Sequence, residues 1–405
     1  MDSSDIPFGC FFPLHAIAVH PQGHPHFCLT SDLKTAGDLR ELQTHRHAVH
    51  SEFKAGRWPA SCRRCQKKEA AGQMSRRTQL WQRKTRLYNS VEAARLLTEQ
   101  ETLRVRHLEI SFSNVCNLTC AMCSSEFSTS WARLDALAES EGLSFRTRPY
   151  RRITKISPQL LEEILEHSAD LDLIIVKGGE PTRDPLCLEF LVELQRRRRD
   201  AGPIVFIQTN GTRPPDEWLP QLKNLRLEIG FSLDGWSDVY DWIRGTSFAT
   251  VLSHLHMVHA TEHVQAVSID FTLSLFNSFH LEEFFTRVLE LKGELPKLRR
   301  CPVGQWMQQP YGSAQALNLR NRLQVVEKIR PLLTAHSQFF LNCENLLDVM
   351  TRPQLPMELV DQAERWYEFI SRARGRSLER FDAQLRAALI GPTGEDLQNA
   401  SAPQL

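Results

Sequence analysis

Alternating apolar runs and helical segments between residues 107 and 291 restrict the fold of this chain more than any other feature. Each run is rich in Val, Ile and Leu, which indicates strands buried on both faces, as in parallel sheets covered by helices. The strands are expected at residues 107–113, 171–179, 203–211, 225–235 and 266–276. Helices are expected at about residues 157–168, 186–197, 217–222, 249–259 and 281–291. This pattern predicts an α/β barrel or an open α/β sheet.

Polar segments follow the predicted strands where each strand ends. SFSN precedes a cysteine-rich loop, GGEP follows LIIVK, TNG follows VFIQ, and SLDG closes LEIGF. Ligands bind at the carboxyl ends of the strands in both α/β architectures. We therefore expect these four segments to build one functional site.

Composition narrows the class of protein. The 405 residues are 41% hydrophobic and 24% charged, as in a soluble protein of two or three domains or of one large domain with extensions. Lys plus Arg (49) nearly balances Asp plus Glu (48), so no overall charge attracts nucleic acid or membrane. No signal-like start and no apolar stretch of about 18 residues occurs, which predicts a cytoplasmic protein. In that compartment the ten cysteines are expected to be metal ligands or catalytic thiols.

Three cysteines lie within eight residues of the sequence NVCNLTCAMC. Cys116, Cys120 and Cys123 have the spacing C-x3-C-x2-C, which lets one tight loop present three thiolates. A structural zinc ion with a distant fourth ligand fits this spacing. A 4Fe-4S cluster with one open iron fits it as well.

The same cysteines, followed in order by GGEP, TNG and SLDG, resemble the radical S-adenosylmethionine (SAM) superfamily over about residues 107–300. The resemblance implies a partial (β/α)6 TIM-like barrel with a 4Fe-4S cluster on Cys116, Cys120 and Cys123. It further implies that the amino and carboxylate groups of the SAM methionine bind the open iron. An electron would then cleave SAM to methionine and a 5′-deoxyadenosyl radical, which abstracts hydrogen from a substrate.

The resemblance assigns the first SAM contacts to residues of two loops. Gly178, Gly179 and Glu180 would receive the methionine amino group through backbone carbonyls and a carboxylate. The alternative for the glycines is a β-to-α turn. Met122 matches a position whose backbone meets the adenine, and the alternative is core packing.

Further contacts are implied at the next two strand ends. Asn210 and Ser232 match positions near the sugar and the methionine carboxylate, although Asn210 also suits a turn before Gly211. Asp234 and Arg244 match positions of polar contacts in related enzymes. A solvated ion pair is the alternative for these two residues.

Four further cysteines precede the predicted barrel. They are Cys10, Cys28, Cys62 and Cys65, enough for a cluster with protein ligands only. Their segments resemble the auxiliary-cluster module of the twitch or SPASM type, here placed before the barrel, and a hairpin is expected to carry Cys28. A four-cysteine zinc site is the alternative. Nearby histidines could replace a ligand, although most are expected to be exposed turn residues: His15, His20, His24 and His26.

The remaining thiols and one basic run have separate predictions. Cys301 is expected at the end of the last barrel strand, where it would donate a hydrogen atom to a product radical; a buried inert thiol is the alternative. Cys187 is expected to pack in a helix, and Cys343 has no predicted place. Residues 196–199, all arginine, are expected to solvate a helix C-terminus.

These features divide the chain into five predicted regions. They are an N-terminal auxiliary-cluster module (1–75), a helical linker (76–106), the radical SAM partial barrel (107–311), a C-terminal helical extension (312–390) and a disordered tail (391–405). Residues 66–85 are expected to be helical, and only helices are expected after residue 312.

The functional hypothesis is a radical SAM enzyme of the oxidoreductase or maturase type with two 4Fe-4S clusters. Related proteins suggest a peptide or small-molecule substrate, changed by oxidation, epimerisation or crosslinking, and a reducing partner such as flavodoxin or ferredoxin. No membrane or nucleic-acid partner is expected. Two alternatives stay open: a tRNA-modifying radical SAM enzyme, and a non-catalytic iron-sulfur or zinc scaffold.

Overall fold

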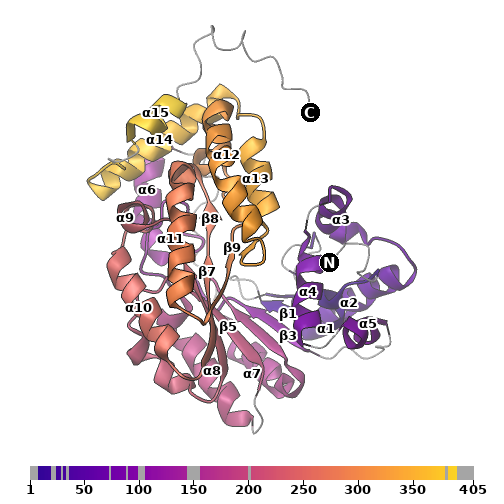
Figure 1. The fold of residues 1–405 in the computed structure, drawn as a ribbon. Coiled ribbons are helices and arrows are strands. Elements are labelled where there is room, and N and C mark those ends of the chain that lie inside the picture. Colours follow the sequence, from indigo (N-terminus) through magenta and orange to yellow (C-terminus); the bar gives the residue numbers. More distant parts are fainter. Residues whose placement is uncertain are drawn as a thin grey trace.

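The computed structural model shows helices packed around a largely parallel sheet (Figure 1). The structure describes residues 8–19, 24–28, 31–32, 36–72, 74–87, 90–98, 105–143, 156–198, 202–378 and 382–389.

Nine strands form the main sheet in the order β11-β9-β7-β6-β5-β4-β3-β1-β2. Six of them come from the predicted barrel: β3 (His107–Ile110), β4 (Leu173–Val176), β5 (Ile204–Thr209), β6 (Arg226–Ser232), β7 (Val264–Asp270) and β9 (Leu298–Pro302). Each of these six pairs in parallel with its neighbours. The prediction of a partial α/β barrel with six strands is therefore confirmed.

Side chains alternate between the two faces of the sheet, as the pleat requires. On β6, Ile229 and Phe231 are buried in the main core. Glu228 lies on the opposite face, where it forms an ion pair of 2.9 Å with Arg300 of β9. The second face is therefore polar, and it is the face that the strand-end motifs continue.

Helices connect successive strands, as expected. They are α7 (Pro158–Glu166), α8 (Pro185–Arg197), α9 (Ser237–Arg244), α10 (Phe248–Ala260) and α11 (Leu281–Glu294). The expected helix at 217–222 is wrong, because this segment forms two 3-10 turns, Pro215–Glu217 and Leu219–Leu222. Pro220 has no amide hydrogen, so it cannot join an α-helical hydrogen-bond ladder there.

The N-terminal region joins the barrel sheet. β1 (Ala16–Val19) pairs antiparallel with β2 (Pro25–His26), which confirms the predicted hairpin, although Cys28 lies just after β2 and is not part of it. β1 also pairs in parallel with β3, and this pairing was not predicted. The sheet therefore continues past the boundary that the sequence suggests.

Five helices pack beside this edge of the sheet (Figure 1). They are α1 (Phe11–His15), α2 (Leu39–Lys54), α3 (Arg63–Ala70), α4 (Arg76–Leu87) and α5 (Ser90–Thr98). The segment 66–85 was expected to be helical, and α3 and α4 divide it between them.

The C-terminal helices and one helix of the barrel region gather at one end of the molecule (Figure 1). They are α6 (Ala132–Ser140), which comes from the barrel region, together with α12 (Leu319–Ala335), α13 (Cys343–Thr351), α14 (Met357–Arg374) and α15 (Asp382–Leu389). The expectation of helices alone is wrong, because β11 (Phe340–Leu341) pairs with β9. Within the described residues, no helix has the length and apolar composition needed to cross a membrane. The predicted tail, 391–405, lies outside the described residues, and the domain boundaries stay predictions.

Candidate active site and N-terminal cysteine cavity

The loop after β3 brings the three predicted cluster ligands together. Cys120 is buried, and Cys116 and Cys123 are half-buried. Burial raises the pKa of Cys116 and of Cys123, and the nearby Cys120 raises both further. The three thiols therefore lie within electrostatic range of one another and form a set of soft sulfur donors suited to iron or zinc.

Two tryptophans hold the backbone of this cysteine loop. Trp131 Nε1 donates a hydrogen bond of 3.1 Å to the Cys120 carbonyl. Trp366 of α14 donates a bond of the same length to the Ala121 carbonyl. The two indole rings stack with centroids 5.8 Å apart. A C-terminal helix thus fixes the loop between its second and third cysteines.

Arg244 places a cation beside the second cysteine. Its Nη1 lies 3.7 Å from Cys120 Sγ, and its guanidinium forms an ion pair with the fully buried Asp234. Burial lowers the pKa of Arg244, but Asp234 and Cys120 outweigh burial and raise that pKa above its ordinary value. The alternative of a solvated ion pair is therefore wrong. A cation here stabilises negative charge on Cys120.

Both glycines of GGEP are required by close approaches, of Gly178 to a side chain and of Gly179 to the backbone of the cysteine loop. Gly178 and Gly179 have φ of 85° and 55°, in the left-handed region that favours glycine. A Cβ on Gly178 would lie 2.6 Å from Ser111 Oγ, and one on Gly179 would lie 2.5 Å from the Val115 carbonyl oxygen. The end of β4 can therefore pack against the cysteine loop only with glycine at both positions.

Glu180 is buried, and its carboxylate accepts hydrogen bonds from neighbouring residues of the protein. Its carboxylate accepts hydrogen bonds from Thr182 N (3.2 Å) and Oγ1 (2.6 Å), Thr209 Oγ1 (2.6 Å) and Asn210 N (2.6 Å). Burial raises the pKa of Glu180, although these bonds oppose the shift. The carboxylate ties the end of β4 to the end of β5. Its expected contact with the methionine amino group stays a prediction.

The other predicted SAM contacts lie around the same loop. Asn210 Nδ2 is 3.7 Å from Cys116 Sγ, and its Oδ1 also accepts the Thr212 amide at 2.9 Å, as a turn former would. Ser232 is buried at the end of β6. Met122 is partly buried and packs against a second hydrophobic core, which contains Trp131 and Trp366. The roles of Asn210, Ser232 and Met122 toward SAM stay predictions.

All four N-terminal cysteines line one cavity. Its volume is about 20 Å³, and it is partly open to solvent. Its lining consists of Cys10, Phe12, Phe27, Cys28, Ser31, Phe53, Trp58, Cys62, Cys65 and Arg77. Burial is the largest cause that raises the pKa of Cys10, and the other three thiols raise this pKa further. Burial also raises the pKa of Cys62 to about 12. Four sulfur donors in such a cavity fit an all-cysteine cluster and also fit zinc. Among the described residues, no three Cys, His, Asp or Glu side chains are arranged as a site for a metal ion.

Two nearby histidines differ from the prediction. His15 and His26 are buried, so the expectation of exposed turn residues is wrong for both. His26 Nδ1 accepts the Cys28 amide at 3.0 Å, so it supports a predicted ligand. His24 is exposed, and His20 lies outside the described residues.

The isolated thiols are packed in the protein. Cys301 has 0% exposed surface and belongs to the main core, and burial raises its pKa. Its amide donates to the Phe339 carbonyl at 2.8 Å, beside β11. The structure therefore supports the buried-thiol alternative for Cys301. Cys187 is buried in α8 as predicted, and Cys343 begins α13.

Sequence reasoning missed a buried charged group in the barrel sheet. Glu109 of β3 is 1% exposed and forms ion pairs with Arg76 of α4 and with Lys177, which follows β4. Burial raises the pKa of Glu109, but Arg76 and Lys177 outweigh burial and hold it well below its usual range. One signal was available, because HLEI contains a charged residue inside an apolar strand.

The fold and the cysteine loop define a class: a parallel α/β barrel that carries three thiols at the carboxyl ends of its strands. Residues 110–269 match the model of the Radical SAM superfamily. The match runs from the end of β3 into β7 and includes the cysteine loop, so this segment of the chain is similar to the domains of that superfamily. Comparison with curated proteins gave no match.

Three solved structures are similar to parts of this chain. anSMEcpe with bound AdoMet is 18% identical, with a TM-score of 0.42, over 57% of this chain and 61% of that one. Streptococcus suis SuiB bound to the precursor peptide SuiA is 15% identical, with a TM-score of 0.40, over 74% and 61%. TYW1 with a lysine-pyruvate adduct is 15% identical, with a TM-score of 0.34, over 55% and 72%. The chain thus spans less than two thirds of the length of anSMEcpe and of SuiB.

Proposed function

We propose that this chain is a radical SAM enzyme whose first cluster is held by Cys116, Cys120 and Cys123. The observation that carries the proposal is the meeting of these thiols with the ends of β4 and β5, in a region matched by the superfamily model. When bound, the cluster supplies one electron that breaks the S–C5′ bond of SAM, giving methionine and a 5′-deoxyadenosyl radical.

The residues of the chain have distinct tasks in this proposal. Gly178 and Gly179 let backbone approach the cysteine loop, and their carbonyl groups would receive the methionine amino group. Arg244 stabilises the negative charge of Cys120 and its cluster from 3.7 Å. Trp366 holds the loop backbone and covers it, which helps to keep water from a reactive radical.

The N-terminal cavity would hold a second 4Fe-4S cluster on Cys10, Cys28, Cys62 and Cys65, in a twitch/SPASM-type module. Two contacts support the placement of this N-terminal module beside the barrel. Arg76, from the cysteine-bearing region, pairs with Glu109 of β3, and Lys68 Nζ of α3 lies 5.7 Å from the centre of the Trp306 ring, beyond β9. Four protein ligands leave no iron open for substrate, which favours electron relay or a structural role.

The proposed substrate is a peptide or small metabolite, changed by oxidation, epimerisation or crosslinking. A flavodoxin or ferredoxin in the cytoplasm would supply the electron. The polar face of the barrel sheet, which includes the Glu228–Arg300 and Glu109–Lys177 pairs, would meet that substrate.

The test begins with purification without oxygen, followed by iron, sulfide and zinc analysis. About eight iron atoms per chain are expected for two clusters. Dithionite and SAM should then yield 5′-deoxyadenosine, measured by liquid chromatography and mass spectrometry. Zinc in place of iron, or no 5′-deoxyadenosine from iron-loaded protein, would contradict the enzyme and favour the scaffold alternative. Tight, salt-sensitive tRNA binding would redirect the substrate proposal to RNA.

A further inference from the structure

Arg77 is a buried cation in the lining of the N-terminal cysteine cavity. It lies near the start of α4, and only 9% of its side chain is exposed. A guanidinium remains charged in proteins, so burying one requires compensating partners. Its partners therefore indicate what the residue holds in place.

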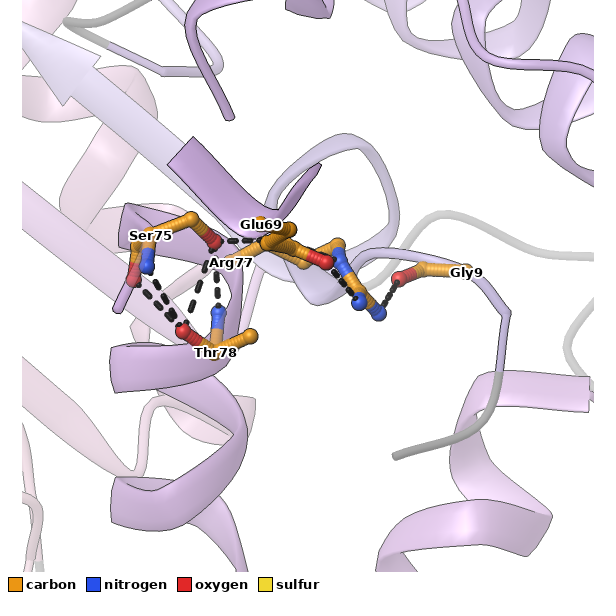
Figure 2. Close-up of polar contacts among 5 residues, drawn as sticks. All are labelled: Gly9, Glu69, Ser75, Arg77 and Thr78. Carbon is orange, nitrogen blue, oxygen red and sulfur yellow. Dashed lines mark hydrogen bonds and ion pairs between the residues drawn. The ribbon is translucent and has the colours of Figure 1, made fainter. Parts of the chain in front are cut away.

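Figure 2 shows Arg77 with two of its partners, Gly9 and Glu69, which come from two different segments of the N-terminal region. Its Nη1 donates to the Gly9 carbonyl at 3.0 Å, one residue before Cys10. Its Nε donates to Glu69 Oε1 at 3.0 Å, and Nη2 meets the other oxygen of the same carboxylate. Glu69 lies on α3, one helical turn after Cys65.

The same guanidinium reaches a third segment. It lies 5.5 Å from the centre of the Trp58 ring, which also lines the cavity and precedes Cys62 by four residues. A cation over an indole face is favourable. One side chain thus touches the approach to Cys10, the helix of Cys65 and the approach to Cys62.

A cap fixes the helix that carries Arg77. Ser75 Oγ accepts the Thr78 amide at 3.1 Å, and Thr78 Oγ1 accepts the Ser75 amide at 2.9 Å (Figure 2). Ser75 Oγ also donates to Glu69 at 2.5 Å. Glu69 therefore joins α3 to the start of α4, and the Arg77 fork is held in its orientation.

We propose that Arg77 is a positioning residue of the N-terminal cysteine centre, which gathers three cysteine-bearing segments and places a positive charge beside the group they bind. This inference rests on the proposed second cluster. An electron added to such a cluster is an added negative charge, so a neighbouring cation favours the reduced state. Loss of Arg77 should therefore lower both the metal content of the site and its reduction potential.

The experiment uses the full chain with Cys120→Ala, which removes the first cluster, so that iron and electron paramagnetic resonance report on the N-terminal centre alone. Arg77→Gln is expected to lower its iron content at least twofold and to move the midpoint potential of the remainder to a more negative value. Arg77→Lys keeps the charge but loses the two-pronged contact, so it should restore the potential and leave the iron content low. Arg40→Gln, at an exposed position of α2, should change neither.

Glu69→Gln provides a second approach if Arg77→Gln does not fold. It removes a negative charge beside the centre and leaves Arg77 in place, so the potential should move in the positive direction. Unchanged potentials in Arg77→Gln and Glu69→Gln proteins that contain iron would overturn the inference and leave the second cluster standing. Zinc, or no metal, at the N-terminal site of the Cys120→Ala parent would overturn the second cluster and this inference together, while 5′-deoxyadenosine formation by the unmodified chain would still support the first cluster.

Discussion

The cysteine site of the barrel and the cysteine site of the N-terminal region are held together in different ways. Cys116, Cys120 and Cys123 share one short loop, whose backbone is bound by Trp131 and Trp366. The N-terminal four come from separated segments and meet around a cavity with aromatic walls and a buried arginine. The first site is therefore fixed by backbone contacts to one loop. The second depends on the packing of several segments by side chains.

The largest expected effect comes from removing one cysteine from each site. Cys120→Ala should abolish 5′-deoxyadenosine formation and remove about half of the iron, because the loop has no spare thiol. Cys62→Ala should remove about half of the iron but leave SAM cleavage largely intact. Iron analysis and the 5′-deoxyadenosine assay check both variants. Equal loss of SAM cleavage in the two would show that the centres do not load independently.

Removing the cation beside Cys120 tests how far the barrel site depends on buried charge. Arg244→Gln leaves Asp234 buried without its partner, so the free energy of unfolding should fall by about 3–5 kcal/mol. Urea denaturation measures this change. The double variant Asp234→Asn with Arg244→Gln should recover much of the stability and leave SAM cleavage slow, since the charge near Cys120 is still missing. A single variant as stable as the parent would contradict the buried ion pair.

A matched pair of glycine variants tests the backbone contact of the barrel site. Gly179→Ala places a Cβ 2.5 Å from the Val115 carbonyl oxygen, so the loop must move and the first cluster should be lost. Gly56→Ala also stands at positive φ, 72°, but meets nothing within 4 Å. It should cost only about 1 kcal/mol and leave the iron content unchanged. Similar iron contents in the two variants would show that close approach does not fix the loop.

The smallest expected effect is an alkaline loss of stability in protein without metal. Burial raises the pKa of Cys116 and Cys123 in the barrel, and of Cys10 and Cys62 in the cavity. Unfolded thiols titrate near pH 8.5, so this stabilisation is complete below that pH and is lost as pH rises toward the folded pKa, about 12 for Cys62. Urea midpoints should therefore fall between about pH 9 and 11. Iron-loaded protein should show a weaker loss, and identical losses would contradict this origin.

Local patterns were sufficient for five of the six barrel strands and for the strand-end motifs, because apolar runs and glycines report on their own surroundings. They could not reveal that β1 pairs with β3, since pairing partners far apart in sequence leave no local sign. β11 was missed for a similar reason. It has only two residues and owes its conformation to β9. That strand also explains why Cys301 is covered.

Among the site residues, the sequence identified the cysteines but few of the groups that hold them. Arg77, Glu69 and Trp366 appear in helical segments that contain many similar residues, so nothing in the pattern marks them as contacts of the cysteine-bearing segments. Arg244 and Asp234 were named, although the complete burial of Asp234 was not expected. These roles arise from tertiary packing, which decides whether an arginine faces solvent or a thiol.

The insertion of β1 into the barrel sheet has a consequence for the order of folding. β1 is made early in synthesis, but its partner β3 follows only after α2 to α5, so their pairing must wait for a long loop to close. Cys28 lies just after β2, which forms a hairpin with β1. Cys116 lies in the loop after β3. Iron delivered before β3 has been made would meet an incomplete N-terminal site. We therefore expect both proposed centres to take up metal only after β1 has paired with β3.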